Sequence, residues 1–170
     1  MCSSQRIGVL GGGQLGRMLV ESANRLNIRT TVLDAENSPA KQINGQDEHI
    51  NGSFRDHEAV RKLAEQCDIL TPEIEHVDTY ALEQVQSQVR IEPSWRTIRI
   101  IQDKFRQKCH LEKFGVPMSE HVELQENTVE GLRAAGERLG LPFMLKSKTG
   151  AYDGRGNVWR SLWRPICMSC

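Results

Sequence analysis

The chain has 170 residues, and its 22 Lys and Arg residues balance 22 Asp and Glu residues, so the formal net charge is zero. A balanced charge gives no electrostatic footprint for a nucleic acid, and we expect no such partner. No apolar run approaches the roughly 18 residues of a membrane span, and the N-terminus lacks a hydrophobic secretory core. We therefore expect no membrane partner and a cytoplasmic location.

The cysteines are odd in number and scattered: Cys2, Cys67, Cys109, Cys167 and Cys170. This distribution favours reduced thiols over a disulfide framework. The Cys-x-x-Cys pair within the last four residues has no second pair and no nearby His. We interpret it as chance rather than a redox or zinc motif, and we predict no metal site in the chain.

The first elements surround a glycine-rich turn, Gly11-Gly12-Gly13-Gln14-Leu15-Gly16-Arg17. Apolar residues 7–10 before it and β-branched residues 30–34 after it predict two strands, the second ending in Asp34. Between them a helix ending near Asn27 is predicted from its spacing of apolar and small residues: Leu15, Met18, Leu19, Ser22, Ala23 and Leu26. This order is typical of a doubly wound α/β domain, in which the helix N-terminus offers N–H groups to an anion.

The turn permits two interpretations. Gly11, Gly13 and Gly16 with Asp34 downstream match the dinucleotide fingerprint, in which the acid binds a ribose hydroxyl. The same glycines can instead serve only to make a tight turn between strand and helix. An NAD-binding oxidoreductase therefore stays open as an alternative function.

Strands continue to alternate with helices, and further short strands are predicted at 49–53, 68–71 and 89–91. The helices between them are predicted from Asp56 as an N-cap and from apolar positions at helical spacing: Val60, Leu63, Ala64, Cys67, Leu82, Val85 and Val89. The alternation with short links predicts a parallel sheet covered by helices, in a first domain over residues 1–95.

A second domain is predicted to begin after Pro93-Ser94. One helix over 97–114, ended by Gly115, would carry Ile98, Ile101, Phe105 and Cys109 on one side. We then expect a strand over 121–124, a helix capped by Asn127 and Glu130 and closed by Gly140, and a strand over 141–146.

An acidic loop, Thr71-Pro72-Glu73-Ile74-Glu75-His76, follows the fourth strand. Ligands of open α/β sheets bind beyond the carboxyl ends of the strands, so this loop and the glycine turn should face one crevice. If the segment is extended, Glu73 and Glu75 point to the same side, where a carboxylate can accept hydrogen bonds from sugar hydroxyls or an amine. The alternative is a solvated acidic loop, with His76 at the surface.

A second glycine-bearing loop spans Lys146–Asn157 and contains Lys146, Lys148 and Arg155. Backbone N–H groups and cations of this kind suit phosphate oxygens, although the loop is not a P-loop. The alternative is a β-hairpin turn at Asp153-Gly154. By itself, Lys104 reads as a solvated lysine on a helix.

Together these stretches resemble the ATP-grasp ribonucleotide synthetases of purine synthesis. The resemblance is to 5-(carboxyamino)imidazole ribonucleotide synthetases, in particular to the synthetase half of fungal-type, two-domain phosphoribosylaminoimidazole carboxylases. It covers most of residues 5–157. The matching stretches are Gly11–Met18, Asp34–Ala40, Glu73–Asp78, Ile98–Phe105 and Lys146–Asn157.

The resemblance implies an α/β fold: a Rossmann-like pre-ATP-grasp domain that does not bind NAD (1–95), then an incomplete start of an ATP-grasp domain (96–157). It implies that the aminoimidazole ribonucleotide contacts Gln14, Leu15, Glu73 and Tyr152. It also implies that ATP is bound by Lys104 and Lys146 and by a loop that folds over its phosphates: Ala151, Tyr152, Asp153, Gly154, Arg155, Gly156 and Asn157.

The implied reaction is the ATP-dependent carboxylation of 5-aminoimidazole ribonucleotide by bicarbonate. ATP phosphorylates bicarbonate to carboxyphosphate, which delivers its carbon as carbon dioxide to the exocyclic amine. Asp153 and Arg155 would be the catalytic residues, Asp153 orienting or exchanging a proton with the amine. The cofactors would be ATP and magnesium, and the family suggests a homodimer.

The sequence departs from the family after Asn157. Residues 158–170 hold two of the three Trp and two of the five Cys residues, and they lack the acids that hold magnesium in the family. We expect this stretch to be an aberrant tail, from a frameshift, a splicing event or a gene-model product. The chain would then be inactive alone, and a non-catalytic fragment is a further alternative.

Overall fold

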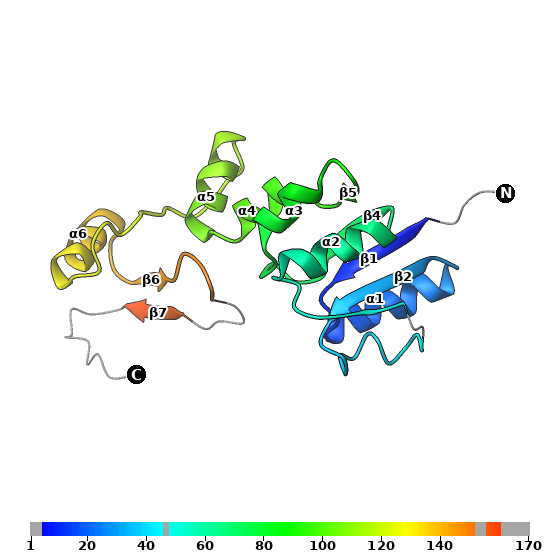
Figure 1. Ribbon diagram of the computed structural model, residues 1–170. Coiled ribbons are helices and arrows are strands. Elements are labelled where there is room, and N and C mark those ends of the chain that lie inside the picture. Colours follow the sequence, from blue (N-terminus) through cyan, green and yellow to red (C-terminus); the bar gives the residue numbers. More distant parts are fainter. Residues whose placement is uncertain (1–4, 46–47, 152–155, 161–170) are drawn as a thin grey trace. The chain divides into compact units, whose positions relative to one another are not determined.

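The computed structural model describes residues 5–45, 48–151 and 156–160 (Figure 1). It divides into two compact units, Met1–Ile101 and Gln102–Cys170. The predicted boundaries after residues 95 and 157 stay predictions. Within the described residues, none of the helices combines the length and the apolar character that crossing a bilayer requires.

The first unit alternates strands and helices along its whole length. Its elements are β1 (Arg6–Leu10), α1 (Gln14–Arg25), β2 (Arg29–Asp34), β3 (Ile50–Asn51), α2 (His57–Gln66), β4 (Ile69–Pro72), α3 (Thr79–Val85), β5 (Arg90–Ile91) and α4 (Trp95–Ile101). The strands form one parallel sheet in the order β3-β2-β1-β4-β5. This confirms the predicted parallel sheet covered by helices.

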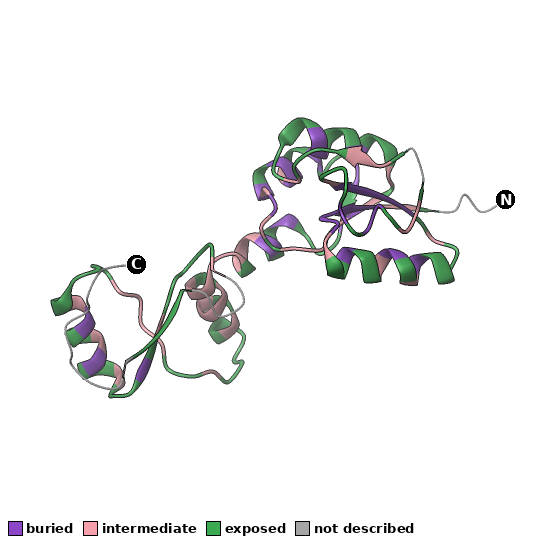
Figure 2. Ribbon diagram, turned by 90° about the horizontal axis from the view of Figure 1, so that it is seen from below, coloured by how far each residue is buried: buried purple, intermediate pink, exposed green. Residues whose placement is uncertain are grey.

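Residues of β1 and β2 alternate between two cores, one on each face of the sheet. Leu10 and Leu33 pack with buried residues of α2, α3 and α4, whereas Val9 and Val32 pack with Val20 of α1. All four strand residues are fully buried, as expected for a parallel sheet with helices on both faces. Figure 2 shows the buried residues along the strands and on the inner sides of these helices.

The apolar face predicted for α1 is only partly confirmed. Ala23 is buried and Leu19 packs against the core, but Leu15, Met18 and Leu26 are 62%, 53% and 70% exposed, and the helix also buries Gly16 and Val20. Small side chains let α1 lie close to the glycine turn, since a Cβ on Gly16 would approach the Gly11 carbonyl oxygen to 2.8 Å. Close packing therefore overrides the larger apolar residues, which are left in solvent.

The single helix predicted over 97–114 is also wrong, because the chain breaks it into α4 and α5 (Lys104–Lys113). The side chain of Asp103 accepts hydrogen bonds from the N–H groups of Phe105 and Arg106 and so begins a new helix. Gly115, at a φ of +70°, follows the end of α5 as predicted.

The second unit also contains α6 (Val129–Leu139), β6 (Phe143–Lys146) and β7 (Asn157–Arg160), and the two strands pair antiparallel. The strand predicted over 121–124 is wrong, since that segment is irregular. The cap of α6 is Thr128, which accepts from the N–H of Gly131, and not the predicted pair Asn127 and Glu130. Gly140 closes the helix as predicted.

Candidate functional site

The glycine turn lies at the carboxyl ends of β1, β2 and β4. Gly11 adopts a φ of +103°, and its N–H donates to the Leu33 carbonyl at 3.1 Å. The Gly12 carbonyl accepts from the Ala40 N–H at 2.9 Å, which ties the turn to the Asp34–Ala40 loop. Among the described residues, no atom lies within 4 Å of the place where a Cβ on Gly13 would stand, and Gly13, the N-cap residue of α1, makes no side-chain cap hydrogen bond. The turn is therefore open on the side of the helix N-terminus.

Both carboxylate oxygens of Asp34 bind the backbone. Oδ2 accepts from the Gly12 N–H at 2.5 Å, and Oδ1 accepts from the Ala35 N–H at 2.7 Å. The dinucleotide interpretation instead needs this acid for a ribose hydroxyl and the glycine N–H groups for a pyrophosphate. The local geometry therefore does not favour an NAD site.

Glu73 closes the turn from the side of β4. Its N–H donates to the Leu10 carbonyl at 2.9 Å, and a Cβ on Gly11 would lie 2.6 Å from its Oε2. The Gly16 N–H donates to the carboxylate, so Glu73 reaches the first turn of α1, where Gln14 and Leu15 lie exposed. Burial and the negative charge of Asp34 raise the pKa of Glu73 above its usual value, and the Gly16 hydrogen bond offsets part of this rise. The structure brings these three predicted residues to one edge of the sheet.

The expectation that Glu73 and Glu75 share a side through extended alternation is wrong. The strand ends at Pro72, and residues 73–77 form bends and turns. Glu73 is half-buried against the glycine turn, whereas Glu75 is exposed.

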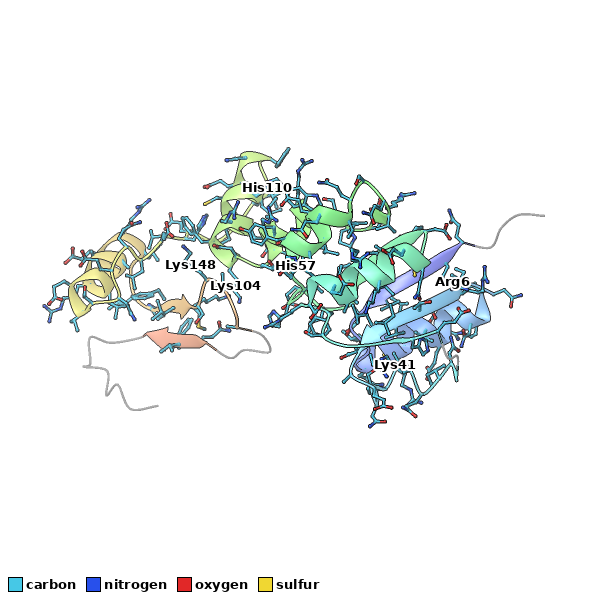
Figure 3. All side chains as sticks on the ribbon, viewed as in Figure 1. Arg6, Lys41, His57, Lys104, His110 and Lys148 are labelled. Carbon is cyan, nitrogen blue, oxygen red and sulfur yellow. The ribbon has the colours of Figure 1, made fainter. Side chains whose placement is uncertain are left out.

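Lys41, which the sequence analysis missed, lies in the first unit (Figure 3) and contacts the backbone of Asp34. It is 7% exposed, and its Nζ donates at 2.7 Å to each of three oxygens: the carbonyls of Asp34 and Ile50 and Oδ1 of Asn51. Burial lowers its pKa, and the nearby charges of Asp34 and Glu36 oppose that shift. Lys41 thus joins the ends of β2 and β3. No pattern in the sequence separates such a buried lysine from a surface one.

Ser38 was missed as well. Its hydroxyl is buried and has no hydrogen-bond partner among the described residues. A Cβ on Gly12 would lie 2.6 Å from this Oγ, so Ser38 packs against the back of the glycine turn. A side chain at Gly12 would displace it.

In the second unit, four lysines line a cavity of about 420 Å³: Lys104, Lys108, Lys146 and Lys148. Its other walls include apolar residues such as Leu132, Phe143 and Leu145. Glu123, which also lines it, pairs with Lys148. Cations beside an apolar wall suit a ligand with a polyanionic end and a flat, less polar end.

A larger cavity of about 560 Å³ lies between α5 and residues 116–125. Glu120 and Glu123 line both cavities, but among the described residues the lining of the larger one has no lysine, adds Glu112 and has Arg138 as its one Lys or Arg residue. The four lysines make the smaller cavity the better site for a phosphate, so charge rather than size selects it.

Some of the residues predicted to bind ATP lie close together in the second unit. Lys104 Nζ donates to the Ala151 carbonyl at 2.7 Å, and the Lys104 N–H donates to the Lys148 carbonyl at 2.8 Å. Lys146 pairs with Asn157 in the β6–β7 register. Gly156 has a φ of +71°, and its carbonyl accepts from the Ser147 N–H. Four predicted residues lie outside the described part of the chain: Tyr152, Asp153, Gly154 and Arg155.

Comparison with protein families gives two matches. Residues 4–102 match the ribonucleotide synthetase preATP-grasp domain, and residues 109–161 match the ATP-grasp domain. Over 157 residues the chain is 57% identical to a phosphoribosylaminoimidazole carboxylase of Candida albicans, covering 91% of this chain and 28% of that protein. It is 32% identical over 153 residues to an N5-carboxyaminoimidazole ribonucleotide synthase of Staphylococcus aureus, covering 89% of this chain and 40% of the relative.

Solved structures agree. A carboxyaminoimidazole ribonucleotide synthase of Aspergillus clavatus, in complex with ATP, superposes with a TM-score of 0.91 at 66% identity, over 96% of this chain and 43% of that chain. Another structure from that organism, in complex with ADP and 5-aminoimidazole ribonucleotide, gives a TM-score of 0.90 at 63% identity. The chain thus spans about 28% of its curated fungal relatives and about 43% of the synthase structures.

The fold and these matches agree on one assignment. The parallel sheet, the glycine turn and Glu73 all lie inside the range of the first family match, which covers more than half of the chain. The chain belongs to the family of the ribonucleotide synthetase preATP-grasp domain, and this domain is followed by residues of an ATP-grasp domain.

Proposed function

We propose that this chain forms part of an enzyme of purine biosynthesis, which carboxylates 5-aminoimidazole ribonucleotide at the expense of ATP and bicarbonate. The observation that carries the proposal is the 57% identity to a phosphoribosylaminoimidazole carboxylase, which runs over 157 residues. A relative with ADP and the ribonucleotide bound adds support for both small molecules as ligands.

The ribonucleotide would bind at the glycine turn of the first unit. Gln14 and Leu15 are exposed beside uncapped N–H groups of α1, and Glu73 offers a half-buried carboxylate next to them. A carboxylate accepts hydrogen bonds from ribose hydroxyls or an amine, and N–H groups at a helix N-terminus favour an anionic group. Tyr152 is proposed as a further contact.

ATP would bind in the lysine-lined cavity of the second unit. Lys104 and Lys146 supply positive charge for the phosphates, and the apolar wall suits the base. The proposed phosphate loop runs over Ala151–Asn157 and includes Gly154 and Gly156, and its last residue, Asn157, is the first residue of β7.

In the reaction, bicarbonate oxygen attacks the γ-phosphorus of ATP, which gives carboxyphosphate and ADP. Carboxyphosphate then breaks into carbon dioxide and phosphate, and the amine of the ribonucleotide adds to the carbon with loss of a proton. Asp153 is proposed to orient the amine or take this proton, and Arg155 to stabilise charge on the transferred groups. Magnesium would neutralise phosphate charge, but the described residues contain no group of three His, Cys, Asp or Glu that fits a metal ion. We therefore assign no ligand to it.

The proposal is tested by ligand titrations followed by NMR on the 170-residue chain. ATP is expected to shift the amides of residues 104–108 and 143–148, and the ribonucleotide those of residues 11–16 and 73. NAD is the control, and it should leave residues 11–16 unmoved. Shifts at the glycine turn with NAD but not with the ribonucleotide would instead support the oxidoreductase.

Three narrower expectations remain proposals: a homodimer, a cytoplasmic location and the absence of turnover by this chain alone. The last is checked by measuring ADP release with and without the ribonucleotide. Ribonucleotide-dependent release of ADP would contradict it.

A further inference from the structure

Two carboxylates of the first unit flank the same glycine turn from different strands. Asp34 ends β2 and holds the Gly12 N–H at 2.5 Å, while Glu73 follows β4 and accepts from the Gly16 N–H. The Glu73 carboxylate also packs against Gly11, where a Cβ would approach it to 2.6 Å. The turn between them therefore has its backbone N–H groups divided between two acids that repel each other.

We propose that Asp34 is a positioning residue of the ribonucleotide site, which fixes the glycine turn through Gly12 and controls the charge of Glu73 across it. The inference rests on the proposed function only in naming the ligand. It assigns Asp34 the opposite role to the one that a dinucleotide site would give it, since its oxygens face the backbone and not a ribose.

The geometry explains why an aspartate is needed. Its two oxygens accept from two separate N–H groups, Gly12 and Ala35, and an asparagine has only one acceptor for them. The Nζ of Lys41 donates to the backbone carbonyl of Asp34, which fixes the backbone at this residue. The N–H of Ala35 and the Nζ of Lys41 therefore hold Asp34 so that its carboxylate faces the turn. Neither group is among those that shift the pKa of Glu73.

Few other charges act on Glu73. The groups that face it are Asp34 from the end of β2 and Glu75 from its own loop, and α1 contributes the N–H of Gly16. Burial raises the pKa of Glu73 most, and the charge of Asp34 and then that of Glu75 raise it further. Ribose or amine recognition by Glu73 as an acceptor requires its ionised form, so the charge of Asp34 adds to burial in raising the pH below which binding weakens.

The test is an NMR titration of the Glu73 side-chain carboxyl in the 170-residue chain and in Asp34→Asn. We expect the midpoint for Glu73 to move to lower pH in the variant. At neutral pH we expect ribonucleotide binding to weaken by roughly tenfold, because the Gly12 N–H loses its charged acceptor. The pH at which binding falls should shift in the same direction as the Glu73 midpoint.

Asp68→Asn is the matched control, because Asp68 also accepts a backbone N–H, that of Arg6 at 2.7 Å, but at the other end of the strands. It should leave the Glu73 midpoint unchanged. An unchanged midpoint in Asp34→Asn would overturn the proposal.

Should Asp34→Asn fail to fold, the wild-type chain decides. If the two acids act on each other across the turn, the Gly12 amide, which Asp34 holds, is expected to shift over the same pH range as the Glu73 carboxyl. A Gly12 amide that does not move over that range would overturn the proposal. If the ribonucleotide does not bind the wild type, the proposed function fails, while these titrations still test the role of Asp34.

Discussion

Gly11 has a backbone conformation that a side chain adopts only with strain, and it also lies in contact with Glu73. In Gly11→Ala the new Cβ would meet Oε2 of Glu73 at 2.6 Å, so the carboxylate must leave the turn. We expect the free energy of unfolding to fall by about 1–3 kcal/mol, and ribonucleotide binding to weaken as well. Urea denaturation and isothermal titration measure the two effects.

Gly45→Ala is the matched control, since no atom of the described residues lies within 4 Å of a Cβ there and Gly45 does not have a positive φ. Its unfolding free energy should stay within about 0.5 kcal/mol of the wild type. Equal losses in the two variants would show that Gly11 is not specially constrained.

His49 makes the first unit sensitive to acid. Its Nδ1 accepts from the Val32 N–H at 3.1 Å, and its Nε2 contacts the Asn44 carbonyl at 3.0 Å, so the ring is neutral with the proton on Nε2. Burial lowers the pKa of His49 below 6.5, against the Asn44 hydrogen bond, and the charge of Lys41 lowers it further. As the pH falls, His49 therefore becomes protonated in the unfolded chain before it does so in the folded chain.

The sign follows from that order of protonation. The full contribution of His49 to stability is present above pH 6.5 and is lost as the pH falls towards the folded-state pKa. We expect the urea midpoint of the wild type to drop between pH 7.5 and pH 5.5, and this drop to shrink in His49→Gln. An equal drop in both proteins would contradict the assignment.

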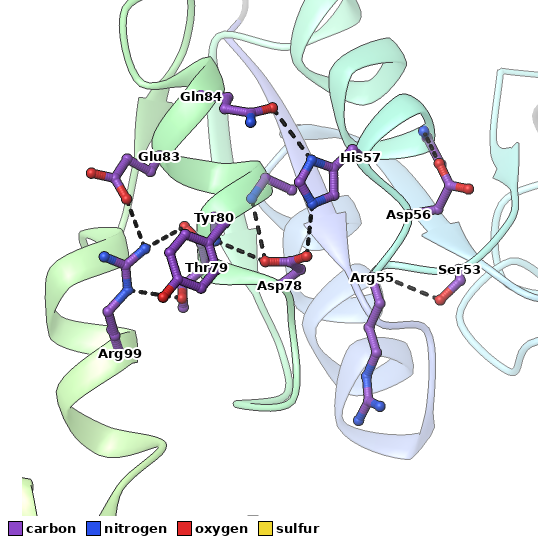
Figure 4. A network of polar contacts seen from close by, with 12 residues as sticks. Ser53, Arg55, Asp56, His57, Asp78, Thr79, Tyr80, Glu83, Gln84 and Arg99 are labelled. Atoms are coloured by element: carbon purple, nitrogen blue, oxygen red, sulfur yellow. Dashed lines mark hydrogen bonds and ion pairs between the residues drawn. The ribbon is translucent and has the colours of Figure 1, made fainter.

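At the scale of elements, Arg99 holds α4 against α3 (Figure 4). Its guanidinium lies 4.4 Å from the ring centroid of Tyr80 and 4.3 Å from that of Trp95. Nε donates to Oγ1 of Thr79 at 3.0 Å, and Nη2 lies 2.8 Å from Oε2 of Glu83. The planar group thus stacks and forms hydrogen bonds in directions that an ammonium group does not reproduce.

Arg99→Lys should lower the free energy of unfolding by about 1–2 kcal/mol, although the charge is kept. Arg96→Lys is the control, because Arg96 is exposed and its guanidinium lies over the Trp95 ring, 4.8 Å from the centroid. Thermal unfolding of both variants gives the comparison. If the two substitutions cost the same, stacking and the hydrogen-bond geometry of Arg99 contribute nothing measurable.

Across the whole molecule, the order of elements in the first unit followed from sequence patterns, because strands buried on both faces give short apolar runs between helical stretches. The burial face of α1 followed only in part: Ala23 and Leu19 lie on it, but backbone contact with the glycine turn leaves Leu15 and Met18 exposed. The break at Asp103 was hidden because apolar spacing continues through it, and only the capping hydrogen bonds reveal a second helix.

The candidate site divides in the same way. Motif spacing and family resemblance predicted roles for Gln14, Glu73 and Lys146, which lie in or beside glycine-rich turns, and resemblance alone predicted one for Lys104. These roles stay predictions. The role of Lys41 could not be predicted, because the three oxygens of β2 and β3 that its Nζ binds come together only in the folded chain. The inward orientation of Asp34 is of the same kind, because the fingerprint expects that carboxylate to face a ligand.

Burial is distributed unequally between the units. Among the described residues, all but two of the buried apolar side chains belong to the first unit, and the exceptions are Leu132 and Phe143. Helices α2 and α5 allow the effect of burial to be compared directly, because each has 10 residues and an aspartate as its N-cap. The N-cap is Asp56 in α2 and Asp103 in α5. α2 buries four residues, whereas α5 buries none. Since length and N-cap residue are matched, and Asp103 accepts two N–H groups against one for Asp56, the N-caps do not favour α2, and we expect tertiary burial to dominate the difference in protection from hydrogen exchange.

We therefore expect the amides of α5 to exchange at least about tenfold faster than those of α2, because they can open without exposing a core. The measurement is hydrogen exchange followed by NMR or mass spectrometry on the intact 170-residue chain. ATP binding at the lysine-lined cavity should slow exchange in α5, which carries Lys104, and leave α2 unchanged. Equal protection of the two helices without ligand would show that burial within each unit does not govern local stability in this chain.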